Sequence, residues 1–186
     1  MASSSPVDAA GLEARARRAY ERGRLAAGVR RAWPVVPMAM LSLAGCQRPV
    51  FTLVAGAVLA AAAVGLVWRG EAWGRAVVPG LVAGTLPLLL PILVRQLHAC
   101  PGGSCAGACL VACTVGGLAA GAALGVRAVR LESGRLSYLI AGAVIAGLTG
   151  ALGCAVSGVA GVVGMAAGVV VASTPVVALS LASRRT

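Results

Sequence analysis

Long apolar segments alternate with short basic segments along most of the chain. A helix needs about 20 apolar residues, within a range of roughly 17–25, to cross a lipid bilayer. Five segments reach this length, and the first is shorter but can be extended by Arg30 and Arg31, whose long side chains reach the membrane surface. The pattern predicts an all-α, polytopic membrane helix bundle with six transmembrane helices, at 32–46, 50–68, 76–94, 106–126, 136–156 and 159–182.

The composition supports a membrane bundle. Hydrophobic residues make up 59% of the chain and charged residues only 11%, whereas about a quarter of the residues of a soluble domain are charged. Water cannot solvate so apolar a surface, so lipid is expected to be the solvent for residues 32–182.

The residues before the first apolar segment are predicted to form a cytoplasmic tail, 1–31. Residues 1–11 are small and polar, which is typical of a disordered segment, and 12–31 are rich in arginine and predict a helix that Asp8 could cap. This helix either lies near anionic lipid headgroups or docks a cytoplasmic protein partner. The candidate residues for either role are Arg15, Arg17, Arg18, Arg22 and Arg24.

The arginines fall almost entirely on one side of the predicted bundle. If the six helices alternate in direction, 14 arginines lie on the side of the two chain ends, and only Arg48 and Arg95 lie on the other. Basic residues in short loops mark the cytoplasmic side. Residues 1–31 and 183–186 are therefore predicted to be cytoplasmic, and the chain to be a multi-pass protein of the bacterial cytoplasmic (inner) membrane. No basic surface with interleaved aromatic residues is present, which argues against nucleic acid as a partner.

All six cysteines and the single histidine are predicted to lie at or near the outer face. Outward cysteines in an oxidising compartment can form disulfides, act in redox sensing, or bind a soft metal such as Cu(I) or Zn(II). The spacing matches no standard zinc module, so neither a metal nor another cofactor is required, and these alternatives stay open. A fourth alternative applies to Cys46 alone, because Leu43-Ala44-Gly45-Cys46 resembles a lipidation signal. The candidate residues are Cys46, His98, Cys100, Cys105, Cys109, Cys113 and Cys154.

A glycine stripe continues the cysteine spacing along the fourth predicted helix. Gly117, Gly121 and Gly125 repeat every four residues and form two overlapping Gly-x-x-x-Gly motifs. Such motifs let helix backbones approach closely in membranes. We expect the stripe to pack against glycines of the sixth predicted helix or to support an oligomer.

The sequence does not predict an enzyme. It contains no phosphate-binding loop, no Gly-x-Ser-x-Gly motif and no His-Glu-x-x-His motif. No charged residue falls in the middle of a predicted transmembrane helix, which argues against proton-coupled transport.

An arginine-rich helix at 12–31 followed by six short transmembrane helices resembles, in layout, the small six-helix membrane anti-sigma factors of bacteria. The resemblance implies a regulatory or sensory membrane protein that holds a cytoplasmic partner through its N-terminal segment. The His-x3-Cys-x2-Cys pattern of the zinc-type members is absent from 1–31. Two alternatives remain: a small carrier for a soft metal ion, and a structural subunit of a membrane complex.

Overall fold

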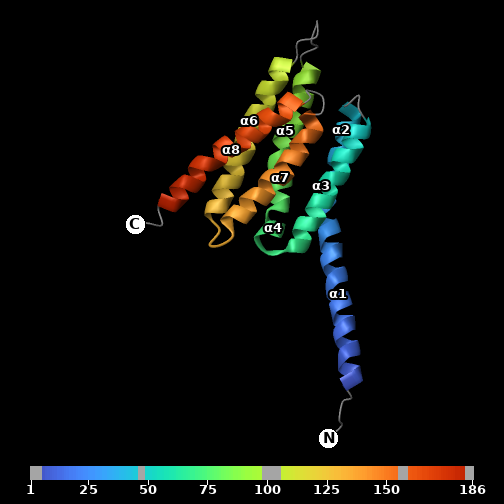
Figure 1. The fold of residues 1–186 in the computed structure, drawn as a ribbon. Helices are drawn as coiled ribbons and strands as arrows, with labels where there is room; N and C mark the ends of the chain where they lie inside the picture. Colours follow the sequence, from blue (N-terminus) through green and yellow to red (C-terminus); the bar gives the residue numbers. More distant parts are fainter. Residues whose placement is uncertain (1–5, 46–48, 98–105, 155–158, 183–186) are drawn as a thin grey trace.

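The computed structural model describes residues 6–45, 49–97, 106–154 and 159–182, and this described part of the chain is all-helical (Figure 1). The helices are α1 (Pro6–Ala32), α2 (Val35–Gly45), α3 (Pro49–Arg69), α4 (Glu71–Arg75), α5 (Val77–Leu97), α6 (Ala106–Val129), α7 (Arg135–Cys154) and α8 (Val159–Ala182).

Three helical stretches are long and apolar enough to cross a membrane, where the sequence predicts six transmembrane helices. They are Pro49–Arg69 in α3, Leu110–Val129 in α6 and Arg135–Gly153 in α7. The apolar stretches of α5 and α8 are shorter within the described residues, at Val77–Leu90 and Val163–Pro175. The structure thus describes an all-α chain with three candidate membrane spans.

The core of the bundle is formed by α5, α6, α7 and α8, and α2 and α3 pack beside α7 (Figure 1). One buried cluster joins α3, α5 and α7 through side chains such as Leu59, Leu81 and Ile145. A second joins α6, α7 and α8 through Leu124, Ala146 and Val169. These clusters place α7 at the centre of the fold.

Glycines bring the backbones of neighbouring helices together. A Cβ atom added to Gly84 of α5 would lie 2.6 Å from Thr149 Cβ of α7, and one added to Gly153 of α7 would lie 2.7 Å from Leu88 Cα of α5. Lipid tails are as apolar as leucine, so close packing rather than the hydrophobic effect must hold membrane helices together. The interface of α5 and α7 has this character, although the glycine spacings predicted close packing only between the fourth and sixth predicted helices.

The first predicted transmembrane helix, 32–46, is wrong as a single helix. The helical run breaks after Ala32 and resumes at Val35 as the short helix α2. Proline disfavours helical geometry at the residue before it, so Trp33 before Pro34 interrupts the run, and a tighter turn follows in which the Val36 N–H donates to the Trp33 carbonyl oxygen at 3.1 Å. Pro37 is the third residue of α2, in the first turn of a helix, where a proline is tolerated.

The end of α1 and the whole of α2 nevertheless run along the same neighbour. A Cβ atom added to Gly28 of α1 would lie 3.4 Å from Val64 Cγ1 of α3, and one added to Gly56 of α3 would lie 3.5 Å from Ala39 Cβ of α2. Farther along, the Ser42 hydroxyl donates to the Leu152 carbonyl oxygen of α7 at 2.6 Å. The last turns of α1 and the helix α2 therefore pack one after the other along α3.

The predicted disordered segment, 1–11, is also partly wrong, because α1 begins at Pro6. Proline suits the first position of a helix, where its missing N–H is not needed. Asp8 is the third residue of α1, so it does not stand at the cap position that the sequence predicted for it. Residues 1–5 and the predicted C-terminal tail, 183–186, lie outside the described residues.

Candidate functional site: the basic end of the bundle

The basic loops of the described chain meet at one end of the bundle. The connection between α6 and α7 lies against α4, since a Cβ atom added to Gly134 would lie 2.7 Å from Ala72 Cβ. Arg31 Nη1 of α1 donates to the Gly74 carbonyl oxygen of α4 at 3.5 Å. This end, called the basic end below, carries Arg69, Arg75, Arg127, Arg130 and Arg135 in addition to the arginines of α1.

Arg24 anchors α1 to the basic end. Its Nη2 donates to the Trp68 carbonyl oxygen at the C-terminus of α3, and its guanidinium lies 5.5 Å from the centre of the Tyr20 ring. A cation at a helix C-terminus satisfies unpaired carbonyls and complements the dipole. Arg24, predicted from sequence as a partner-binding or lipid-binding residue, is thus engaged in holding the fold.

Replacing Arg24 with glutamine is expected to lower the stability of the chain by about 1 kcal/mol, because both the cap and the favourable dipole interaction are lost. Unfolding of the purified protein in mild detergent, followed by circular dichroism, measures the change. Arg22→Gln is the matched control, since exposed Arg22 lies two residues away on the same helix. Equal destabilisation by both substitutions would contradict a specific role for Arg24.

Beyond Arg24, α1 extends away from the bundle into open space (Figure 1). We call residues 11–23 the arm. Leu12 and Tyr20 are each 65% exposed, and Arg17 pairs with Glu21 of the same helix, at 3.2 Å. Arg15, Arg18 and Arg22 are exposed as well. The arm therefore presents cationic side chains and two large apolar ones without covering any part of the described bundle.

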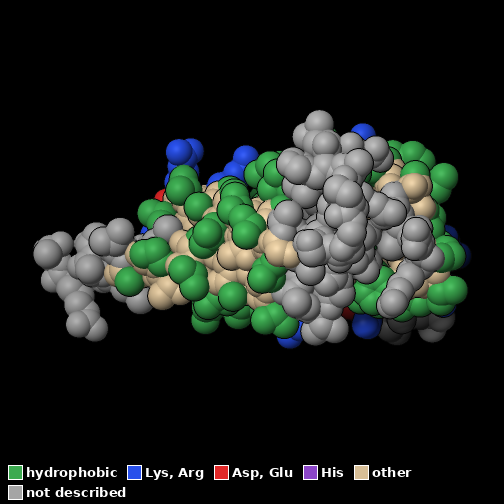
Figure 2. Space-filling model, turned by 90° about the horizontal axis from the view of Figure 1, so that it is seen from above, with side chains coloured by type: hydrophobic (Ala, Val, Ile, Leu, Met, Phe, Trp, Pro, Cys, Tyr) green, Lys and Arg blue, Asp and Glu red, His purple; other side chains and the backbone are tan. Residues whose placement is uncertain are grey.

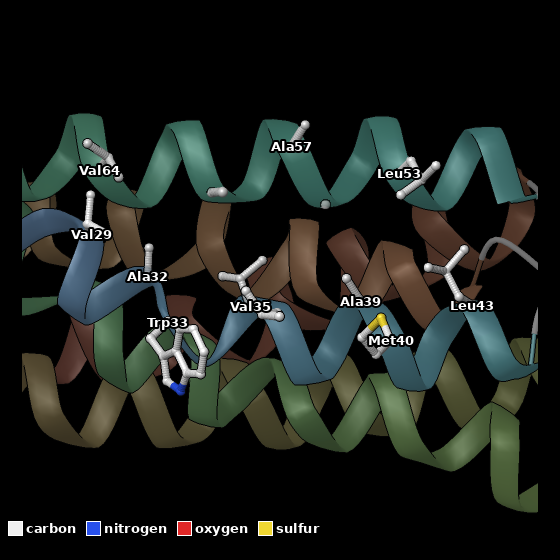
Figure 3. A pocket seen from close by; sticks show the side chains of 13 residues that line it. Val29, Ala32, Trp33, Val35, Ala39, Met40, Leu43, Leu53, Ala57 and Val64 are labelled. Atoms are coloured by element: carbon white, nitrogen blue, oxygen red, sulfur yellow. The ribbon is translucent and has the colours of Figure 1, made fainter.

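An apolar groove of about 580 Å³ lies between α3 and the line formed by α1 and α2. Figure 3 shows Val29, Trp33 and Met40 on one wall and Leu53 and Val64 on the other. Its lining is almost wholly apolar, so it can receive an apolar chain but offers little to fix a polar ligand. The apolar periodicity of the sequence did not predict this groove, although small residues on both facing helices are a signal for such a gap.

A second hollow, of about 630 Å³, lies on another face of α1, toward the start of α5. Arg30 and Arg31 line it, and none of its described lining residues is acidic. The remaining lining residues are Ala26, Ala27, Pro34 and Val78. We call it the basic hollow.

Of the predicted thiol cluster, the structure describes one side chain, that of Cys113. It is completely buried, packs against Met165 of α8, and is disulfide-bonded. Among the described residues, no three His, Cys, Asp or Glu side chains are grouped as a metal site requires. Cys46, His98, Cys100 and Cys105, together with the side chains of Cys109 and Cys154, lie outside the described residues.

The glycine stripe of α6 lies against α8. A Cβ atom added to Gly117 would lie 2.5 Å from the Met165 carbonyl oxygen, and one added to Gly121 would lie 2.6 Å from that of Val169. From the opposite side, a Cβ atom on Gly168 would lie 2.8 Å from the Thr114 carbonyl oxygen. Gly125 is buried one turn farther on. The stripe thus serves packing within one chain.

Comparison of the chain with protein-family models, with curated proteins and with solved structures finds no significant match. The resemblance in layout to membrane anti-sigma factors therefore has no relative to support or oppose it. The geometry of the arm, the basic hollow and Cys113 is the basis for a functional proposal.

Proposed function

We propose that the chain is a membrane-anchored regulatory protein whose arm docks a soluble cytoplasmic partner. In this proposal the bundle crosses the bacterial cytoplasmic membrane six times, with both chain ends in the cytoplasm. The observation that carries the proposal is the arm, a cationic helical segment that leaves the bundle without packing on it (Figure 1).

The orientation is supported by the arginines and tryptophans of the basic end. Positive loops mark the cytoplasmic side, and tryptophans gather where the membrane meets water. Trp68 is 44% exposed, and its carbonyl oxygen accepts from Arg24, which holds α1 to the bundle. The ring centre of Trp73 in α4 lies 5.3 Å from the guanidinium of Arg69. The arm begins beyond this level, so in the proposed orientation it lies in the cytoplasm.

Protein docking accounts for the arm better than adsorption to the membrane surface does. A helix that lies in the membrane surface has one strongly apolar face, whereas the apolar side chains of α1 are not gathered on one face. The last turns of α1 also run along α3, a candidate span, so the helix leaves the bundle in the direction of the span rather than across it (Figure 1).

The side chains of the arm indicate the chemistry of the partner. Arginine and tyrosine are over-represented among the residues that dominate binding at protein interfaces. Arg15, Arg18 and Arg22 favour an acidic partner surface by charge complementarity, and Leu12 and Tyr20 add apolar contacts. This combination is consistent with an anti-sigma-like regulator that holds one acidic protein at the membrane.

The carrier alternative has less support. A carrier for a soft metal ion needs free thiolate ligands, and the sulfur of Cys113 is already bonded to another sulfur. The alternative of a structural subunit would place another chain on the exposed apolar faces of the bundle, and it predicts a stable hetero-oligomer after extraction.

Photocrosslinking in living cells tests the proposal. A photoreactive residue at Leu12 or Tyr20 is expected to give one discrete crosslinked product with a soluble protein. The matched control is Val171 of α8, which is 63% exposed and which the proposal places in lipid, so it should capture no soluble protein.

Charge removal from the arm provides the second half of the test. Replacing Arg15 and Arg18 with glutamine is expected to weaken partner binding about tenfold, since two exposed ion pairs contribute up to roughly 1 kcal/mol each. Crosslinks from Leu12 and Tyr20 to lipid alone, or equal capture from Val171, would rule out the docking role.

A further inference from the structure

The basic hollow combines cations with an apolar floor at the level where α1 joins the bundle. Ala26 and Arg30 are spaced by four residues, as are Ala27 and Arg31, so these four share one face of α1. Pro34 follows in the turn after Ala32 and lines the same hollow. Val78, at the start of α5, closes the other side. Two neighbouring guanidinium groups therefore face a cavity whose remaining walls are small and apolar.

Arg31 is held in place by the fold. Its Nη1 reaches the Gly74 carbonyl oxygen of α4, and a guanidinium has five N–H donors, so most of its donors remain for a ligand. Arg30 is exposed beside it. Paired guanidinium groups match the geometry and charge of a phosphate group, and no carboxylate among the described lining residues competes for them.

The depth of the hollow identifies the source of the phosphate. The hollow runs along the last turns of α1, from Ala26 to Pro34, beside the inner half of α3. The candidate span of α3 ends at Arg69, close to Gly74, which Arg31 contacts. The guanidinium of Arg31 thus reaches toward the inner end of the span, where phospholipid headgroups lie. Gly28 already lies beside Val64 of α3, so Pro34 lies deeper, at the level of the acyl chains.

We propose that the basic hollow is a binding site for one anionic phospholipid of the inner leaflet. Its phosphate lies between Arg30 and Arg31, and its glycerol and upper acyl carbons lie against Ala27, Pro34 and Val78. The volume of about 630 Å³ falls within the range of pockets that hold small molecules. The site rests on the membrane placement in the proposed function, and it is independent of whether the arm binds a protein.

Native mass spectrometry of the full chain, released from micelles after titration with phosphatidylglycerol or phosphatidylcholine, tests the site. The wild-type chain is expected to retain one phosphatidylglycerol in preference to phosphatidylcholine. Arg30→Gln combined with Arg31→Gln is expected to weaken that binding about 30-fold, since each arginine near the headgroups contributes about 1 kcal/mol.

Three further variants distinguish binding in the hollow from general electrostatic attraction of lipid to the chain. Arg15→Gln with Arg18→Gln removes the same charge from the same helix but from the arm, and should leave lipid retention unchanged. Ala27→Leu keeps the charge but fills the hollow, and should lower retention, whereas Ala19→Leu on the arm should not. Circular dichroism of each variant confirms that it is folded.

Several results of these experiments would contradict a lipid site in the basic hollow. The site would be overturned if the arm variant and the hollow variant lost phosphatidylglycerol equally, or if the wild-type chain bound both lipids equally. It would also be overturned if the Ala27→Leu chain retained lipid like the wild type. Displacement of the lipid by millimolar inorganic phosphate would also overturn it, because a free anion rather than a lipid would then be the ligand. Failure of the photocrosslinking experiment with intact lipid selectivity would remove the docking role alone.

Discussion

Replacing Gly117 with alanine is expected to destabilise the chain by about 3 kcal/mol or more and to lower its yield from membranes. The added Cβ atom would lie 2.5 Å from the Met165 carbonyl oxygen and 3.0 Å from Met165 Cα. Both atoms belong to the backbone of α8, so no side chain can rotate away. Overpacking of an interior typically costs 1–3 kcal/mol, and more where backbone must move. Helices α6 and α8 would have to separate.

The control for this prediction is Gly65→Ala in α3. Nothing lies within 4 Å of a Cβ atom at that position, so the substitution should be neutral or should stabilise the helix by up to about 1 kcal/mol through its greater helix propensity. Unfolding of both variants in detergent by increasing SDS, followed by circular dichroism, compares them directly. A Gly117→Ala chain as stable as Gly65→Ala would show that α6 and α8 do not pack through the stripe.

Replacing Cys113 with alanine is expected to lower stability by about 2–5 kcal/mol under oxidising conditions, the usual cost of losing a native disulfide. The side chain is fully buried against Met165, and alanine is close to cysteine in size, so the loss reports mainly the crosslink. A thiol reductant should lower the stability of the wild-type protein toward that of the variant. The stability of the variant should change less when the reductant is added.

Thiol alkylation followed by peptide mass spectrometry checks the same bond. In protein denatured without reductant, Cys113 should not react with a maleimide, and proteolysis should yield Cys113 joined to a second cysteine-containing peptide. Full alkylation of Cys113 without reductant would mean that the disulfide is absent, and the thiol would again be available as a metal ligand. The two results distinguish a closed disulfide from the free thiol that the carrier alternative requires.

Several features of the fold can be predicted from the amino-acid sequence. The alternation of apolar and basic segments predicts helices because only segments with their backbone hydrogen bonds satisfied internally are stable in lipid. The four-residue spacing of Gly117 and Gly121 predicts close packing, and α6 does meet α8 there. The arginine pattern predicts one basic end, and α1, α4 and the connection of α6 to α7 do gather at one end.

Other features of the fold depend on contacts between segments that are far apart in the chain. The anchoring of Arg24 needs the carbonyl of Trp68 beside it, and no local pattern separates Arg24 from Arg22, which lies on the same helix. The close approach of Gly84 to Thr149 likewise depends on the register of α5 against α7. A glycine allows close packing in any helix, and only the neighbouring residue shows at which position a glycine is required.

The amino-acid sequence by itself determined that the chain is helical, apolar and basic at its loops, because periodicity, length and charge act locally. Only the tertiary structure decided which arginines hold the fold, which belong to the arm and which line the basic hollow. It also decided that the helix predicted at 32–46 is divided at Trp33 and Pro34, and that the last turns of α1 pack on α3. These features depend on the distances between packed backbones. Glycine and proline residues and arginine side chains are compatible with several arrangements of the helices, and the contacts with a neighbouring helix determine which one is adopted.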